Sequence, residues 1–145
     1  MADQDKNSEY SHLVNDPVRC AVIGVGGYGA TRRRILREAG VFQVVAGVDP
    51  SEEAIKAACT EEPGMVRHQD VAAVAADSSI EAVFICTPAH CHLSQAFECA
   101  RAGKAIFVEK PLGDDLELAG ELVRYCENQG IPHGHGFSAR SHDLS

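Results

Sequence analysis

Short apolar runs alternate along the chain with segments that have an amphipathic helical pattern. The apolar runs are rich in valine and isoleucine, which is typical of strands buried on both faces of a parallel sheet. The segments between them carry apolar residues at helical spacing, and several end at a glycine. The predicted strands are Val18–Ile23, Phe42–Val48, Met65–His68, Ala82–Cys86, Ala105–Val108 and Ile131–Phe137. The predicted helices are Ala30–Ala39, Ser51–Cys59, Asp70–Asp77, His90–Ala102 and Asp114–Asn128.

This alternation predicts the α/β class: a doubly wound, mostly parallel sheet of about six strands with helices on both faces. Ligands bind beyond the carboxyl ends of the strands in such a sheet, so the turns after the strands are the places to look for chemistry. We expect a disordered leader over residues 1–16, one domain over residues 17–140 and a short tail over residues 141–145.

The turn after the first predicted strand contains the pattern Gly24-x-Gly26-x-x-Gly29. In a dinucleotide-binding (Rossmann) turn, the first glycine permits the tight turn, the second allows a diphosphate to approach the backbone, and the third lets the helix pack closely. Unpaired amides and the dipole at the start of the helix favour an anion. Gly27 and Tyr28 complete the predicted binding turn. Glycines in this pattern also occur in strand–turn–helix corners that bind nothing, so the pattern alone leaves both interpretations open.

A carboxylate at the end of the second predicted strand strengthens the dinucleotide interpretation. Asp49 lies 20 residues beyond Gly29, which is the spacing of an acid that accepts hydrogen bonds from the adenosine ribose. A carboxylate there repels a 2′-phosphate, so the sequence favours NAD over NADP as the cofactor. Arginines 32–34 lie inside the predicted helix, and we interpret them as a solvated helix face rather than as partners of a 2′-phosphate.

Composition and charge narrow the function classes. The chain has 145 residues, 45% of them hydrophobic, which is enough for one domain with a core. Its net charge of −8 argues against a nucleic-acid partner, because phosphate binding needs clustered positive charge. No apolar run reaches membrane-spanning length, and the first residues do not resemble a signal peptide. Six cysteines fall in predicted strands and helices and are interpreted as small apolar residues in a reduced, cytoplasmic protein.

Two further segments carry a more specific pattern. Cys86-Thr87-Pro88-Ala89-His90-Cys91-His92 follows the fourth predicted strand, and the fifth lies between Ala102-Gly103-Lys104 and Glu109-Lys110-Pro111. This ordered combination resembles the N-terminal domain of the glucose–fructose oxidoreductase / inositol 2-dehydrogenase family (Gfo/Idh/MocA), which has a Thr-Pro turn, a following histidine, an Ala-Gly-Lys turn and a strand that ends in Glu-Lys-Pro. Gly136-Phe137-x-x-Arg140 is also similar to the family's last strand, so the resemblance covers residues 18–140.

The resemblance implies an NAD(P)-dependent oxidoreductase that acts on a sugar, a cyclitol or a related alcohol–carbonyl pair. In such enzymes the lysine of Glu-Lys-Pro lies near the nicotinamide and stabilises the developing alkoxide. That role falls on Lys110, with Glu109 orienting or pairing with it and Pro111 fixing the turn. The resemblance also gives three residues expected to line the nicotinamide side: Thr87, Pro88 and His92. A surface position for Lys110 and purely local packing for His92 are the alternatives.

Members of that family continue into a second α/β domain that holds most substrate contacts and usually the dimer interface. Because this chain stops at Ser145, we expect that domain to be missing and the chain to bind NAD(H) without efficient turnover. A homo-oligomer or a partner chain is then expected to cover the exposed sheet surface. The alternative is a non-catalytic nucleotide-binding or regulatory module that works with a partner chain.

Histidines and cysteines in two parts of the sequence raise the question of a metal. No CxxC pair or HExxH element is present, so we expect no metal site. A nucleophilic role for Cys91 lacks an evident acid to orient a base. One group consists of Cys86, His90, Cys91 and His92, and the other of His133, His135 and His142.

Overall fold

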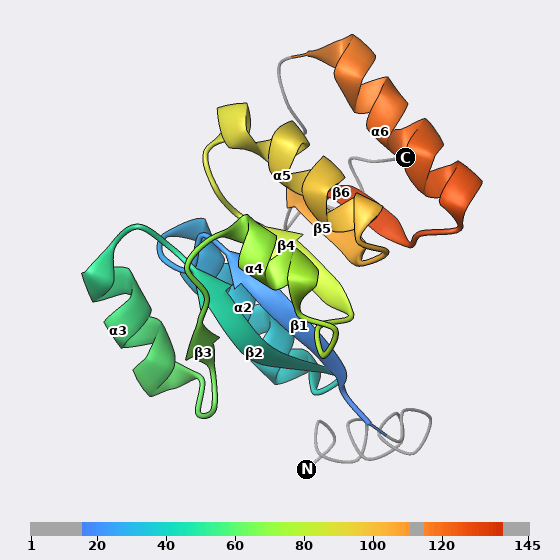
Figure 1. Ribbon diagram of the computed structural model, residues 1–145. Coiled ribbons are helices and arrows are strands. Elements are labelled where there is room, and N and C mark those ends of the chain that lie inside the picture. Colours follow the sequence, from blue (N-terminus) through green and yellow to red (C-terminus); the bar gives the residue numbers. More distant parts are fainter. Residues whose placement is uncertain (1–15, 111–114, 138–145) are drawn as a thin grey trace.

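The computed structural model describes residues 16–110 and 115–137, with the backbone alone over residues 135–137. Six parallel strands form one sheet in the order β3-β2-β1-β4-β5-β6 (Figure 1). The strands are β1 (Val18–Ile23), β2 (Phe42–Val48), β3 (Val66–Arg67), β4 (Ala82–Ile85), β5 (Ala105–Glu109) and β6 (His133–Phe137). The helices are α2 (Tyr28–Ala39), α3 (Glu52–Glu61), α4 (Val71–Ala76), α5 (Ala89–Arg101) and α6 (Leu116–Gln129). The predicted fold class is therefore confirmed.

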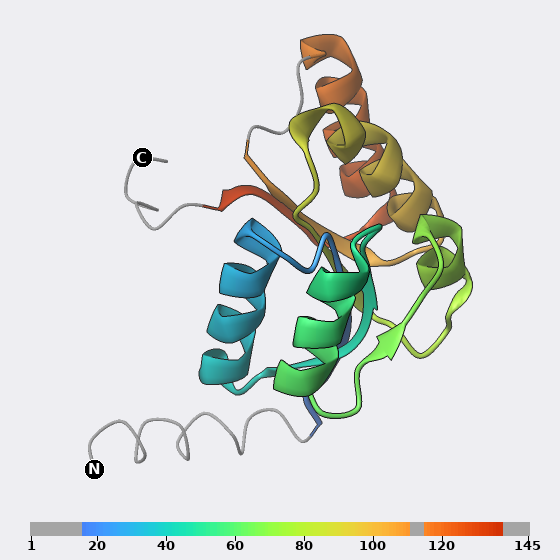
Figure 2. The ribbon, with the colours of Figure 1, turned by 90° about the vertical axis from the view of Figure 1, so that its left-hand side faces the viewer.

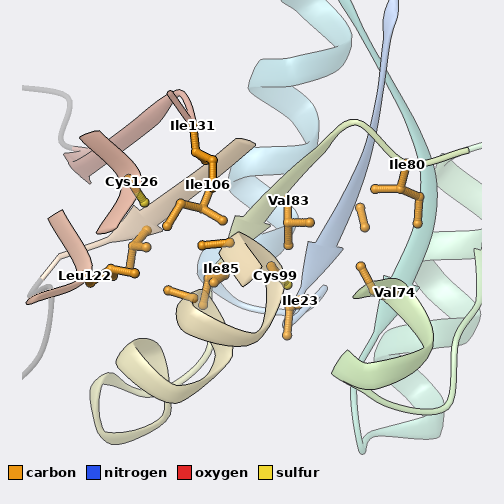
Figure 3. Packing of buried hydrophobic residues seen from close by; sticks show 14 of the residues in the cluster. Ile23, Val74, Ile80, Val83, Ile85, Cys99, Ile106, Leu122, Cys126 and Ile131 are labelled. Atoms are coloured by element: carbon orange, nitrogen blue, oxygen red, sulfur yellow. The ribbon is translucent and has the colours of Figure 1, made fainter. Parts of the chain in front are cut away.

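Each face of the sheet is covered by its own set of helices. Figure 2 shows α2 and α3 together on one face, with α4 and α5 on the other. Alternate residues of β4 point to opposite faces, and all four are buried: Val83 and Ile85 face α4, α5 and α6, whereas Ala82 and Phe84 face α2 and α3. Because both faces are covered, the strand sequences are continuous apolar runs and do not alternate between apolar and polar residues. Figure 3 shows the larger of the two cores, in which β4 packs against residues of α4, α5 and α6.

The order of the strands reverses between β1 and β4. In doubly wound sheets this reversal opens a crevice at the carboxyl ends of the two strands, where ligands bind. Two hydrogen bonds align the carboxyl ends of β1, β2 and β4. The Gly24 amide donates to the Val48 carbonyl at 2.7 Å, and the Cys86 amide donates to the Ile23 carbonyl at 2.8 Å. The turns after β1, β2 and β4 therefore begin at a common edge.

Several boundaries differ from the predicted ones. Helix α2 begins at Tyr28, two residues before the predicted start, because the amides of Gly29 and Ala30 already donate to the carbonyls of Gly26 and Gly27. Helix α3 continues to Glu61, beyond the predicted end at position 59. The predicted leader, except residue 16, and the predicted tail lie outside the described residues.

The interpretation of arginines 32–34 as a solvated helix face is wrong for the first two of them. Arg33 is only 1% exposed. Its Nε donates to the Val25 carbonyl at 3.1 Å, and its Nη1 donates to the buried carboxylate of Glu62 at 2.6 Å. Arg32 is paired as well, and only Arg34 is exposed. The partners lie on other elements, so the pattern within the helix could not reveal them.

The lysine of the Ala-Gly-Lys turn has a structural task. Lys104 is buried, and its Nζ donates to the carbonyls of Asp77 at 2.8 Å and Ile80 at 2.9 Å. An ammonium group can be buried when its donors are satisfied in this way. The turn before β5 is therefore tied to the loop that leads into β4.

Among the helices of the described ranges, none is long and apolar enough to cross a membrane.

Candidate functional site

The turn between β1 and α2 is built around glycines that no other residue could replace without displacing backbone. A Cβ at Gly24, whose φ is +86°, would lie 2.9 Å from the Cys86 carbonyl oxygen. A Cβ at Gly29 would lie 1.7 Å from the Gly24 carbonyl oxygen. Helix α2 therefore begins in direct contact with the end of β1, as the third glycine of the pattern requires.

The outer side of this turn is open. A Cβ at Gly27 would have no heavy atom within 4 Å, and the Tyr28 side chain is 81% exposed. Within the part of the chain that the structure describes, the amides of these two residues donate no hydrogen bond to a backbone carbonyl. They lie at the N-terminus of the 12-residue helix α2, which has no acidic residue in its first turn. Donors, dipole and space together fit an anionic group such as a diphosphate.

Asp49 lies against the same turn, as its spacing from the glycines predicts. Its Oδ2 accepts hydrogen bonds from the amides of Val25 at 3.0 Å and Gly26 at 3.3 Å. Its Oδ1 accepts one from the amide of Ser51 at 2.9 Å, which leaves that oxygen room for a second donor. The carboxylate thus stabilises the turn and can still accept a hydroxyl group. This bracing of the turn was not anticipated from the sequence.

The turn after β4 holds the Thr-Pro pair in a hydrogen-bonded network. The Thr87 hydroxyl donates to Gln95 Oε1 at 2.6 Å. His92 is 2% exposed, and its Nε2 lies 2.5 Å from the Thr87 carbonyl oxygen, which can only accept, so Nε2 carries the proton. Pro88 is exposed at the start of α5. The contact of His92 is thus local, as the alternative of purely local packing predicts.

The end of β5 brings together two residues that the sequence keeps far apart. Arg32 Nε and Nη2 donate to Glu109 Oε1 at 3.0 and 2.6 Å. Within the described ranges Glu109 makes no ion pair with Lys110, which is exposed at the following position. Pro111 lies outside the described residues. Arg32 and Gln95 are the residues of this site that sequence reasoning missed, and no local spacing could have indicated a partner 77 positions away.

The thiol of Cys86, directly after β4, is kept protonated. Burial and, to a smaller extent, the Glu109 carboxylate raise the pKa of Cys86 to about 12, and the Arg32 guanidinium offsets part of this effect. A thiol in this state is a poor nucleophile and a poor metal ligand at neutral pH. Over residues 16–110 and 115–134, no three histidine, cysteine, aspartate or glutamate side chains gather as metal ligands would.

Comparison with known proteins agrees with this geometry. Residues 18–137 match the model of an oxidoreductase family with an NAD-binding Rossmann fold, GFO_IDH_MocA. The chain is 37% identical over 109 residues to inositol 2-dehydrogenase of Rhizobium meliloti, covering 75% of this chain and 31% of that protein. It is 30% identical over 111 residues to 2,7-anhydro-N-acetylneuraminate hydratase of Mediterraneibacter gnavus, covering 77% of this chain and 29% of that protein.

A solved structure gives the same result. GenD2 from gentamicin A biosynthesis, in complex with NAD, superposes with a TM-score of 0.78 at 26% identity, covering 83% of this chain and 34% of that chain. The chain therefore spans about a third of the length of the proteins it matches.

Proposed function

The chain belongs to the Gfo/Idh/MocA oxidoreductase family and is its NAD-binding Rossmann domain, and from this premise we propose that it binds NAD in preference to NADP. We further propose that it serves hydride transfer at a secondary alcohol or carbonyl of a sugar or cyclitol. The observation that carries the cofactor preference is the position of Asp49, whose carboxylate lies against the open glycine turn.

Residues of three turns, those after β1, β2 and β4, bind successive parts of the dinucleotide. The amides of Gly27 and Tyr28 hold the diphosphate at the start of α2, and Gly26 leaves the backbone accessible. Asp49 Oδ1 accepts a ribose hydroxyl, whereas a 2′-phosphate at the same place would meet a carboxylate. Thr87 and Pro88 line the nicotinamide side, and His92 and Gln95 keep that turn in place through the contacts to Thr87.

In the proposed chemical step, one side chain of this chain, that of Lys110, contacts the substrate. The nicotinamide, when bound, accepts or returns the hydride. Lys110 donates a hydrogen bond to the substrate oxygen and stabilises the charge that develops there as the proton leaves. The similarity to an inositol 2-dehydrogenase supports a cyclitol or sugar as the substrate class. All six cysteines are free, which fits a reducing compartment and makes a cytoplasmic location part of the proposal.

A second candidate function is a non-catalytic nucleotide-binding module that works with a partner chain or with a second copy. It is favoured by the make-up of the described site, in which Lys110 is the one side chain to which we give a catalytic role. Both functions include binding of the cofactor, but only the dehydrogenase turns over a substrate. A screen for NADH formation with inositols and aldoses therefore separates them: turnover that is lost in Lys110→Met supports the dehydrogenase.

Calorimetric titration with NADH and NADPH tests the cofactor proposal. We expect NADH to bind at one site and NADPH at least tenfold more weakly. Asp49→Asn weakens both because it also loosens the turn, so the informative quantity is the ratio of the two affinities, which falls toward one. Glu121→Gln, an exposed acid on α6, is the control and leaves the ratio unchanged. Equal affinities in the wild type would contradict the preference for NAD.

A further inference from the structure

An ion pair joins the helix that follows the glycine turn to the end of the fifth strand. Arg32 lies on α2, about one helical turn after Tyr28, and two of its three nitrogens, Nε and Nη2, donate to a single oxygen of Glu109. Helix α2 packs with the core on the β1 and β2 side of the sheet, and β4 lies between β1 and β5. The pair therefore crosses the carboxyl end of β4 and links two elements that are not neighbours.

The surroundings of the pair favour a fixed geometry. The side chains of Arg32 and Glu109 are 17% and 15% exposed, so solvent screens their attraction less than it screens a surface pair. Two N–H groups on one carboxylate oxygen also restrict the direction of the guanidinium. Cys86 directly follows β4, and the two charges of the pair shift the pKa of its thiol in opposite directions, which agrees with a position of the pair near this strand end.

Glu109 is followed immediately by Lys110. Because Arg32 holds the Glu109 carboxylate, the backbone that carries Lys110 is fixed relative to α2 and not only relative to β4 and β6. We infer that Arg32 and Glu109 are positioning residues, which transmit the position of the diphosphate-binding end of α2 to Lys110. This inference rests on the proposed function and extends it, because it makes occupancy of the glycine turn and placement of the lysine mutually dependent.

A competing account gives Arg32 direct contact with the diphosphate. In the structure its Nε and Nη2 are both engaged by Glu109, so in that account the carboxylate competes with the diphosphate for the guanidinium. The two accounts predict opposite effects of removing the carboxylate. If the pair positions Lys110, Glu109→Gln uncouples it from α2. If Arg32 binds phosphate, Glu109→Gln frees the guanidinium and tightens nucleotide binding.

Amide resonances of the whole chain during titration with ADP provide the test. ADP carries the diphosphate and the adenosine but no nicotinamide. Adenosine beside Asp49 at the end of β2 lies three strand spacings from β5, about 14 Å, so it does not touch Lys110. In the wild type we expect the amides of Gly27 and Tyr28 to shift, and the amide of Lys110 to shift with the same ADP dependence.

The variants separate coupling from binding. In Glu109→Gln and Arg32→Gln the Gly27 shift is retained, while the Lys110 shift falls at least threefold and the ADP affinity changes less than twofold. Arg32→Lys keeps part of the Lys110 response, and the exchanged pair Arg32→Glu with Glu109→Arg restores it. Arg34→Gln, an exposed neighbour with the same charge change, is the matched control and behaves as the wild type. If Arg32→Gln does not fold, Glu109→Gln and Arg32→Lys carry the test.

Three results would overturn the inference. The Lys110 amide stays fixed in the wild type while Gly27 shifts, or it responds fully in Glu109→Gln, or Arg32→Gln loses ADP affinity severalfold while Glu109→Gln gains it. A different result, in which neither ADP nor NADH shifts the turn, contradicts the proposed function itself and removes the inference with it.

Discussion

Replacing Gly29 by alanine tests the close contact on which the site is built. The added Cβ would lie 1.7 Å from the Gly24 carbonyl oxygen, well inside the 3.0 Å that real contacts keep, so backbone must move by at least 1.3 Å. Gly29 is inside α2 and has no positive φ, so the cost is steric and not conformational. Overpacking costs about 1–3 kcal/mol when side chains can adjust. Because backbone must move here, we expect a loss of about 3 kcal/mol.

Urea unfolding followed by circular dichroism measures this loss. A decrease of about 3 kcal/mol corresponds to a melting temperature about 10 °C lower for a domain of this size. Gly120→Ala is the control, since Gly120 lies inside α6 and its Cβ would meet only the mobile end of Arg124, at 3.4 Å. We expect that variant to gain about 1 kcal/mol. A Gly29→Ala protein within 1 kcal/mol of the wild type would refute the reasoning.

Three further changes test other parts of the structure. The Ser79 hydroxyl and amide hold the pKa of Asp77 near 2, below its ordinary 3.8; a lowered pKa stabilises the fold above pH 4 and the effect is lost as the pH falls toward 2. The free energy of unfolding, measured with urea, should therefore decrease less steeply over this pH range for Asp77→Asn than for the wild type. Parallel curves would contradict this. Lys104→Met leaves the buried Ile80 carbonyl and the half-buried Asp77 carbonyl without this donor and should cost about 3 kcal/mol in the same assay; a cost below 1 kcal/mol would show that water replaces the ammonium. Cys59 is the one exposed cysteine of the six, whereas burial raises the pKa of Cys20, Cys86 and Cys99 to about 12. Cys59→Ser should therefore remove most of the fast reaction with Ellman's reagent at pH 7.5, and an unchanged fast phase would place the reactive thiol elsewhere.

The fold was predictable because each element carries its own local signal. The apolar runs that became β1 and β4 are buried on both faces, and the sequence shows this directly. Helix α3 begins after Ser51, whose hydroxyl accepts a hydrogen bond from Ala54 as a capping residue does. The start of α2 was misjudged by two residues, since a glycine turn that closes the first helical turn looks like a loop in sequence.

The site was predictable only where its parts follow a fixed spacing. The glycines and Asp49 form such a pattern, and the structure brings them together. The pairing of Arg32 with Glu109 depends on the sheet order, which brings the end of β5 near α2. A run of arginines gives no sign of which members are buried, because their acceptors are supplied by distant elements. Contacts of this kind become visible only after the chain has folded.

A crystal structure of the chain with NADH bound tests the central claim most directly. The account predicts the diphosphate oxygens within hydrogen-bond distance of the amides of Gly27 and Tyr28, with a ribose hydroxyl on Asp49 Oδ1. A dinucleotide bound elsewhere, or one whose diphosphate leaves those two amides unoccupied, would contradict it.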